Sequence, residues 1–423
     1  MSKYIVRNNG PLIGEVSISG SKNAVLPLMA ASILTKEKCE IRCTPALRDV
    51  DVMCEIIKAI GGSVDFDKDN NCVVLETGNI THTGAQFDLA SRMRASILIM
   101  GPLLARTGRA TIALPGGCAI GARPIDLHLK GFEAMGVKIT DKFESGYNYI
   151  EAEADVIAGC DIFLDFPSVG ATENLMTLAV LTEGVTTIQN AAQEPEIVDL
   201  ANFLNKMGAK VKGAGTDTIK IEGVKELHGT THTVIPDRIE TGTFMIAAAI
   251  TKGKIKVNNA VADHVKPISA KLRECGALVT EEDDAIIVDA QDRALISTNI
   301  KTLPYPGFPT DLQSPFMSLL AVTEGVSTVI ETVFENRFMH VAELKKMGAD
   351  VNHEERKAEI VGVKQLSGAV VQATDLRAGA ALVLAGLVAE GTTEVNQVYY
   401  VERGYEKFVE KLSGVGADIE YME

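Results

Sequence analysis

One cysteine lies in a glycine-rich segment together with an arginine. In residues 114–128, which read LPGGCAIGARPIDLH, Cys118 follows two glycines and Arg123 stands five positions later. A thiol can donate a proton or, as a thiolate, attack an electrophile, and a nearby arginine binds anions and favours the thiolate. The segment lies between a strand-like and a helix-like run, where functional loops are common. It therefore predicts a reactive thiol beside an anion site.

The other cysteines indicate neither disulfides nor a thiol protease. There are seven in the chain, an odd number without a CxxC pair, which is typical of a reducing compartment. Cys54, Cys160 and Cys275 are interpreted as small buried apolar residues. A protease would need a histidine facing Cys118, and only His128 stands nearby in the sequence, so we disfavour that reading.

The elements that must position Cys118 belong to an internal repeat. Helix-like phrases such as FEAMGVKIT at Gly136 recur around Gly62, Gly208, Gly276, Gly348 and Gly416, at spacings of 68 to 74 residues. Each phrase follows a helix rich in small apolar residues and then a strand. We expect the first helix of each unit to be central and the more polar second helix to be peripheral.

Six such units predict two domains. The sixth unit stops without closing strands, and the pattern of the opening segment matches the missing piece, so residues 1 to about 21 should complete it. Residues 22–235 would form one domain with three units and carry Cys118. Residues 1–21 and 236–423 would form the other, with Asp311 and Arg403. A chain of 423 residues also exceeds one comfortable core.

Polar residues recur at equivalent points of the units. Those at the start of the first helices are Lys22, Asn23, Arg94, Glu173, Asn174, Asp237, Arg238, Asp311, Asp375 and Arg377. Those in the turn after the next strand are Arg48, Arg123, Glu196, Lys266, Arg337 and Arg403. Because helix N-termini offer free N–H groups, these positions suit anions.

A structural alternative stays open for each of these residues. Carboxylates such as Asp311 and Asp375 could be helix N-caps only, and the arginines could form structural ion pairs. Six basic residues at equivalent points of an acidic chain nevertheless favour a cleft for a multiply anionic ligand; they are Lys22, Arg94, Arg123, Arg337, Arg377 and Arg403.

Composition excludes several other classes. The net charge is −15 and no basic run occurs, which argues against nucleic acid as a partner. The apolar stretches are shorter than the ~20 residues that cross a bilayer, and the first residues do not resemble a signal peptide, so we expect a cytoplasmic protein. His228 and His232 in HGTTH lack the context of a zinc site, and no nucleotide-binding glycine motif occurs, so neither metal nor cofactor is expected.

The chain resembles the enolpyruvyl transferases, in particular the cysteine-containing bacterial branch that uses UDP-N-acetylglucosamine. The resemblance covers essentially the whole chain through the motifs GSKNA, RMRAS, LPGGCAIGARPIDLH, SVGATEN, PEIVDLANFL, DRIETGTF, FPTDLQ, FENRFMHV, ATDLRAG and ERGYE. It implies an α/β fold of two inside-out α/β barrel domains, each with three βαβαββ units.

The resemblance also implies a reaction and its participants. Phosphoenolpyruvate would transfer its enolpyruvyl group to the 3-hydroxyl of UDP-N-acetylglucosamine, with release of phosphate, as the committed step of peptidoglycan precursor synthesis for the cell wall. Cys118 would protonate the methylene carbon and could form a thioether adduct with the substrate. Asp311 would be the base for the sugar hydroxyl. A monomer or weak homo-oligomer is expected.

Binding residues carry over from the same motifs. Lys22, Arg123 and Arg403 would hold the phosphate, with Arg337 and Arg377 near the carboxylate and Asp375 beside them. Asn23 and Arg94 would support both substrates. The contacts expected for the UDP-sugar are Arg123, Pro124, Ile125, Asp126, Leu127, Ser168, Val169, Asp311 and Val333.

One departure concerns the nucleotide, and one feature concerns an inhibitor. Some relatives carry a lysine two residues before the position of Ser168, where this chain has Phe166, so one charged contact is absent. Relatives with aspartate in place of the loop cysteine escape the epoxide fosfomycin. Since this chain keeps Cys118, we predict that fosfomycin alkylates it.

Two rival functions remain open. A 5-enolpyruvylshikimate-3-phosphate synthase would share the architecture and the phosphoenolpyruvate chemistry but is not expected to carry the Cys118 segment. A catalytically silent UDP-sugar sensor could keep the fold, although Lys22, Cys118, Asp311 and Arg403 are all present.

Overall fold

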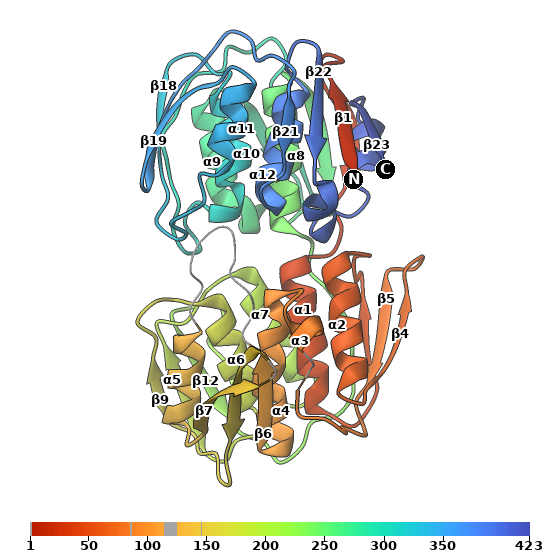
Figure 1. The fold of residues 1–423 in the computed structure, drawn as a ribbon, viewed down its shortest axis with the longest axis vertical. Coiled ribbons are helices and arrows are strands. Elements are labelled where there is room, and N and C mark those ends of the chain that lie inside the picture. The colour runs from red at the N-terminus through yellow and green to blue at the C-terminus, as the bar shows by residue number, and fades with distance from the viewer. Residues whose placement is uncertain (1, 85–86, 114–124, 145) are drawn as a thin grey trace. The chain divides into compact units, whose positions relative to one another are not determined.

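The computed structural model describes residues 2–84, 87–113, 125–144 and 146–423. They divide into two compact units, each with its own hydrophobic core (Figure 1). The first, here the terminal unit, contains residues 2–19 and 236–423. The second, here the inner unit, contains the described residues between 20 and 235. Among the described residues, the chain passes from one unit to the other after residue 19 and after residue 235.

The terminal unit contains three four-stranded sheets. The first has the order β2 (Ile13–Ser17), β14 (Lys254–Asn258), β16 (Ala285–Asp289), β15 (Leu278–Glu281). The second has the order β17 (Ile300–Lys301), β18 (Val326–Ile330), β20 (Lys357–Val361), β19 (Asp350–Glu354). The third has the order β21 (Val370–Gln372), β22 (Thr392–Asn396), β1 (Lys3–Arg7), β23 (Asp418–Met422).

The described part of the inner unit also forms three sheets. The first has the order β13 (Thr231–Thr233), β3 (Cys39–Arg42), β5 (Cys72–Glu76), β4 (Ser63–Asp67). The second has the order β6 (Arg109–Ala113), β8 (Tyr147–Glu153), β7 (Lys138–Glu144). The third has the order β9 (Asp161–Phe163), β10 (Val185–Gln189), β12 (Thr218–Glu222), β11 (Lys210–Lys212).

The five four-stranded sheets share one pattern of pairing. The first two strands in each order are parallel, and the remaining neighbours are antiparallel. Where the two parallel strands are consecutive in the chain, a helix connects them, so that they form a βαβ unit. In the three-stranded sheet, a bridge between Gly84 and Thr111 takes the place of the first parallel strand. The repeat predicted from the glycine spacing is thus a repeat of sheets.

Helices alternate with these strands. Those of the inner unit are α1 (Lys22–Ala31), η1 (Ser32–Leu34), α2 (Arg48–Ala59), α3 (Phe87–Ala90), η2 (Arg94–Ile99), α4 (Met100–Thr107), α5 (Asp126–Ala134), α6 (Val169–Ala179) and α7 (Pro195–Lys206). Those of the terminal unit are α8 (Arg238–Ile250), η3 (Ala262–Val265), α9 (Lys266–Glu274), η4 (Thr310–Leu312), α10 (Gln313–Leu320), α11 (His340–Lys346), α12 (Leu376–Gly386), η5 (Val398–Arg403) and α13 (Phe408–Gly414).

The first helix of each repeat lies inside its unit, which confirms the expectation from composition. In α8 every residue from Ile239 to Ile250 is buried, and α8, α10 and α12 pack against one another. Small residues permit this approach, since a Cβ on Gly242 would lie 2.2 Å from Leu312 Cδ1. The strands alternate buried and exposed residues, as in the eBeBe pattern of β12, so one sheet face covers the helices.

The opening segment divides between two repeats, which corrects the prediction that all of it completes the sixth. β1 does so, because it lies antiparallel between β22 and β23, next to the C-terminal strand (Figure 1). β2 instead pairs in parallel with β14 and begins the fourth repeat. The corresponding place in the first repeat is taken by β13, which is parallel to β3.

Two smaller predictions also need correction. The helix-ending glycine of the first repeat is Gly61, which has a φ of 105°, and not Gly62. In the other five repeats the predicted glycine does adopt a positive φ. Cys54 and Cys275 are buried as predicted, but Cys160 is partly exposed.

Among the described helices, none is both long and apolar enough to span a membrane.

Candidate active site

In the terminal unit, Asp311 is bound by two buried arginines. Arg337 Nη2 lies 3.0 Å from Asp311 Oδ1, while Arg377 Nη2 and Nε donate to Oδ2 at 2.9 and 3.2 Å. Both arginine side chains are 3% exposed, whereas the Asp311 side chain is 25% exposed. The carboxylate is therefore the most exposed member of the cluster.

The cluster has more cationic donors than Asp311 satisfies. Asp237 adds a second carboxylate charge near Arg377, but Arg337 Nε, Arg337 Nη1 and Arg377 Nη1 have no hydrogen-bond partner in the described part of the chain. Buried donors left unpaired cost about 1–3 kcal/mol each, more when charged. An anion with several oxygen atoms would satisfy these donors, because each guanidinium presents a planar fork that matches carboxylate or phosphate.

Aromatic rings support both guanidinium groups. Arg337 lies over the Phe334 ring, 5.4 Å from its centre, and Arg377 lies 5.3 Å from the centre of the Tyr405 ring. The Tyr405 hydroxyl is 2.9 Å from Thr243 Oγ1 on α8. The sequence prediction missed Phe334 and Tyr405, although both lie inside the motifs FENRFMHV and ERGYE that carried the resemblance.

Glu331 is a second residue that the sequence prediction missed. Its fully buried carboxylate accepts bonds from the N–H groups of Val333 and Phe334 at 2.8 and 3.1 Å. It also accepts from the hydroxyls of Thr302 and Thr310, both at 2.9 Å. Thr310 adjoins Asp311 in the chain, so Glu331 joins the loop after β18 to the short helix that carries the candidate base. No repeat position or motif pointed to it.

The N-cap alternative holds for one aspartate and fails for the other. Asp375 caps α12, since its carboxylate accepts from the N–H groups of Arg377 and Ala378 at 2.8 and 3.1 Å. Asp311 lies inside η4, where Pro309 occupies the cap position. Arg403 ends η5, which packs against α12, and its side chain is half-buried. Asp311, Val333, Arg337, Asp375, Arg377 and Arg403 thus all belong to the terminal unit.

The inner unit carries a separate set of predicted residues. Lys22 begins α1, and its ammonium group lies 3.1 Å from Asp49 Oδ2 in the first turn of α2. Asn23 follows it and is half-buried. Ser21 caps this helix by accepting from the Ala24 N–H. Arg94 begins η2, which packs against α1.

Five of the predicted UDP-sugar contacts lie at the starts of two helices that pack together, α5 and α6. Ile125 stands at the N-cap position of α5, where Asp126 is exposed and Leu127 is half-buried. Ser168 caps α6 by accepting from the Ala171 N–H at 3.4 Å, and Val169 is the first residue of that helix. Phe166, in place of the lysine of some relatives, is 43% exposed.

A buried acidic group lies next to these elements in the inner unit. Glu173 lies in α6 and is 4% exposed, and burial, followed by the charges of Glu196 and Glu194, raises its pKa well above its usual value. Glu196 occupies the repeat position that holds arginine in four other units. Burial and the two neighbouring carboxylates therefore favour the protonated form of Glu173.

Three predicted residues lie outside the described part of the chain: Cys118, Arg123 and Pro124. Their roles stay predictions from the sequence. All the other predicted site residues are described, and they fall into the two sets given above.

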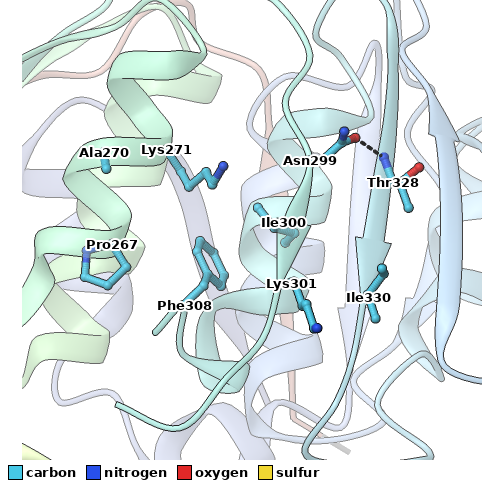
Figure 2. A pocket seen from close by; sticks show the side chains of 9 residues that line it. All are labelled: Pro267, Ala270, Lys271, Asn299, Ile300, Lys301, Phe308, Thr328 and Ile330. Atoms are coloured by element: carbon cyan, nitrogen blue, oxygen red, sulfur yellow. Dashed lines mark hydrogen bonds between the residues drawn. The ribbon is translucent and has the colours of Figure 1, made fainter. Parts of the chain in front are cut away.

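A hollow of about 540 Å³ in the terminal unit involves none of the predicted residues. It lies between α9 and the strands β17 and β18, and its lining includes Lys271, Ile300, Lys301 and Phe308 (Figure 2). The side-chain oxygen of Asn299, another lining residue, already has a hydrogen-bond partner, because it accepts from the Thr328 N–H at 2.7 Å. Lys271 is paired with Glu274. The hollow offers no converging set of unpaired donors, so we do not assign the chemistry to it.

The family of the chain follows from a comparison with known proteins. A family model described as EPSP synthase (3-phosphoshikimate 1-carboxyvinyltransferase) matches residues 6–412. The chain therefore belongs to this family of enolpyruvyl transferases, as the motifs predicted.

Curated relatives and solved structures define the resemblance further. The chain is 58% identical over 422 residues to UDP-N-acetylglucosamine 1-carboxyvinyltransferase 2 of Carboxydothermus hydrogenoformans, covering 99% of both chains. It is 56% identical over 418 residues to UDP-N-acetylglucosamine 1-carboxyvinyltransferase 1 of Caldanaerobacter subterraneus, again covering 99% of both.

Solved structures confirm the fold class. The enolpyruvyl transferase NikO from Streptomyces tendae is 25% identical, with a TM-score of 0.89 over 100% of this chain and 99% of that one. An EPSP synthase from Acinetobacter baumannii superposes with a TM-score of 0.79 over the full length of both chains, and at 19% identity this likeness concerns the fold alone.

Proposed function

We propose that the protein transfers the enolpyruvyl group of phosphoenolpyruvate to the 3-hydroxyl of UDP-N-acetylglucosamine, with release of phosphate. Full-length relatives at more than half identity carry the name of this activity. The structural observation that supports it most is the pair of buried arginines around Asp311, which has more cationic donors than its own carboxylate satisfies.

The chemistry assigns roles to both sets of residues. The Cys118 thiol gives its proton to the methylene carbon of phosphoenolpyruvate, which leaves an oxocarbenium-like C2. The sugar hydroxyl attacks C2 while Asp311 accepts its proton. The tetrahedral intermediate then loses a methyl proton and phosphate, which restores the double bond in the ether product. Arg337 and Arg377 hold the substrate carboxylate, and Lys22, Arg123 and Arg403 hold its phosphate.

The remaining assignments concern the sugar nucleotide. Asn23, Arg94, residues 123–127, Ser168, Val169 and Val333 bind it, with Asp375 ordering the start of α12 behind Arg377. No cofactor or metal enters the reaction. A cytoplasmic site of action and alkylation of Cys118 by fosfomycin are further parts of this proposal.

A phosphate-release assay with each substrate alone and with both together tests the activity. We expect release only with both, and none when shikimate 3-phosphate replaces the UDP-sugar. Release with shikimate 3-phosphate alone as acceptor would establish the rival synthase. Tight binding of UDP-N-acetylglucosamine without any release would establish the silent sensor.

Variants of Cys118 test the acid role. Cys118→Asp keeps a proton donor and should retain turnover while losing alkylation by fosfomycin, which intact-protein mass spectrometry detects as one added inhibitor. Cys118→Ser has a far weaker acid and should be badly impaired. Full activity of the serine variant would remove Cys118 from the mechanism.

A further inference from the structure

The hollow beside α9 has mostly apolar walls and basic groups without acidic ones. Five of the nine described residues that line it have apolar side chains: Pro267, Ala270, Ile300, Phe308 and Ile330. Two are lysines, Lys271 and Lys301, and none of the nine is acidic, although the chain has a net charge of −15. A volume of about 540 Å³ is within the range of small-molecule sites.

The walls come from a helix and two strands that pack beside one another. Ala270 lies on α9, and Ile330 lies at the end of β18 on its outer face, because the adjacent Val329 is buried. Ile330 is 37% exposed. Lys271 and the ring of Phe308 extend into the space between α9 and the two strands (Figure 2). Regular elements therefore form this hollow in advance of any ligand.

The two lysines differ in what they already bind. The Lys271 ammonium group lies 2.6 Å from Glu274 Oε2, which also accepts from the Thr298 hydroxyl at 2.7 Å. The ammonium group of Lys301, the register partner of Ile330, has no partner among residues 2–84, 87–113, 125–144 and 146–423. A single unpaired ammonium beside apolar walls suits a ligand with one small anionic group and an apolar body, whereas a phosphate favours several converging donors.

One wall of the hollow continues into the Glu331 contacts described above. Lys301 directly precedes Thr302, and Ile330 directly precedes Glu331. The Thr302 hydroxyl donates to Glu331 Oε1 at 2.9 Å. A displacement of this wall therefore changes the contacts of the carboxylate that holds Thr310.

Phe308 connects the hollow to the candidate base. It is 5% exposed, and its ring meets the edge of Phe316 on α10 with ring centres 5.4 Å apart. Its carbonyl accepts from the Leu303 N–H at 3.0 Å. Asp311 follows three residues later in η4. A ligand that contacts the Phe308 ring thus acts on the segment that places Asp311.

We propose that this hollow is an effector site for small amphipathic carboxylates. The anionic end pairs with Lys301, and the apolar chain lies against Phe308 and Ile330. Occupancy shifts Phe308 and lowers kcat, because a base is effective only within hydrogen-bond reach of the hydroxyl that it deprotonates. This effect on kcat rests on the proposed function, since it requires Asp311 to act as that base, whereas the binding does not.

Calorimetric titration with octanoate, 1-octanol and acetate tests the binding. Octanoate has both an anionic group and an apolar chain, and each of the other two probes has only one of them. We expect saturable binding of octanoate, and binding of 1-octanol and of acetate that is weaker by about threefold or more. Lys301→Met should weaken octanoate binding about threefold, as loss of an exposed ion pair implies. Lys364→Met, the same charge change at another exposed lysine of this unit, should not.

A substitution that fills the hollow identifies where octanoate binds. Ala270 is exposed on α9 and lines the hollow, so a phenylalanine there occupies the space of the ligand. Ala270→Phe should abolish octanoate binding. The matched control is Ala59→Phe at an exposed position of α2, which should bind octanoate like the parent chain.

Phosphate release with both substrates measures the coupling to the reaction. Octanoate at saturation should lower kcat of the parent chain about threefold or more without raising the KM for phosphoenolpyruvate, and Ala270→Phe should no longer respond. Inhibition that phosphoenolpyruvate relieves and that persists in Ala270→Phe would place octanoate at Arg337 and Arg377 and overturn the proposal.

Three other outcomes would also overturn it: no saturable binding of octanoate, equal binding of octanoate and 1-octanol, or an unchanged kcat at saturation. Failure of the parent chain to release phosphate would instead overturn the proposed function. The titrations of the parent chain, Lys301→Met and Ala270→Phe would then still test whether the hollow binds the carboxylate.

Discussion

Glu240 provides a quantitative test of how the terminal unit is held together. Its carboxyl, 2% exposed on α8, accepts from the Ser19 N–H at 2.8 Å and from the Lys411 ammonium group at 2.6 Å. Lys411 also donates to the Ser19 hydroxyl, which donates to Glu406. The cluster thus fixes residue 19, the last before the chain leaves this unit. We expect replacement of Glu240 by glutamine to change stability by an amount that depends on pH.

The size and the sign of this pH-dependent change in stability follow from the pKa of Glu240. Burial, only partly opposed by Lys411, raises the pKa of Glu240 from 4.5 to about 7. Between pH 4.5 and pH 7 the folded chain binds more protons than the unfolded chain. The contribution of Glu240 to the free energy of unfolding is therefore complete below pH 4.5 and is lost as the pH rises to 7. The loss between pH 5 and pH 8 amounts to about 2–3 kcal/mol. A glutamine cannot ionise, so the variant lacks this pH-dependent contribution to stability.

The glutamine also has a constant cost. Ser19 N–H and Lys411 both donate to this group, and the amide NH2 of glutamine cannot accept from either of them, whereas both oxygens of the carboxyl can; this should destabilise the variant by about 1–3 kcal/mol at every pH. We therefore expect Glu240→Gln to be less stable than the parent chain at pH 5 and close to it, or above it, at pH 8. Urea unfolding followed by circular dichroism at both pH values measures this change.

A matched control separates Glu240 from general effects of charge. The Glu420 side chain is 57% exposed, and Glu420→Gln should shift the urea midpoint equally at pH 5 and pH 8. If the difference between Glu240→Gln and the parent chain is the same at both pH values, the carboxyl does not titrate between them and the reasoning from burial is wrong.

Three further substitutions test the packing around the two sets of site residues. Glu331→Gln should lower kcat about tenfold and weaken UDP-N-acetylglucosamine binding by no more than about threefold, because it loosens Thr310 beside Asp311 and only one of several UDP-sugar contacts, Val333; an unchanged kcat in steady-state assays would show that Glu331 is not a positioning residue. Arg106→Met removes the Nη1 group that donates to the carbonyls of Ile33, Thr35 and Thr77 at 2.7–3.0 Å, and should cost about 3 kcal/mol in urea unfolding; a midpoint equal to that of the parent would contradict this. Gly131→Ala places a Cβ 2.4 Å from a Leu175 methyl group between α5 and α6 and should cost about 1–3 kcal/mol, which a calorimetric Tm records as a decrease and an unchanged Tm would refute.

The repeat was predictable because each of its signals is local. A glycine that follows a helix can adopt a positive φ and end the helix without help from distant residues, and a helix apolar on all faces must be buried. The central position of α8 follows from the second of these facts, whereas the strand order within each sheet was seen only in the structure. The assignment of β2 did not follow, since an edge strand can pair with any open neighbour and its own five residues do not specify which.

The sequence predicted which charged residues belong to the site, but it did not predict which residues are in contact there. Asp311, Arg337 and Arg377 were identified from repeat position and motif, but Asp311 and Asp375 had equal claims to be N-caps, and only the structure shows that Asp375 is one. Glu331, Phe334 and Tyr405 were missed because their importance lies in what they touch, which is a property of folded neighbours and not of residue type.

The sequence by itself determined the family, the repeat and the kinds of charged group available, because glycine stereochemistry, apolar patterning and long motifs are carried by the chain itself. Tertiary structure decided which aspartate is held by two arginines and which strand completes which sheet. These depend on residues far apart in the chain, such as 311 and 377 or 17 and 258, whose proximity exists only after the helices and strands have packed.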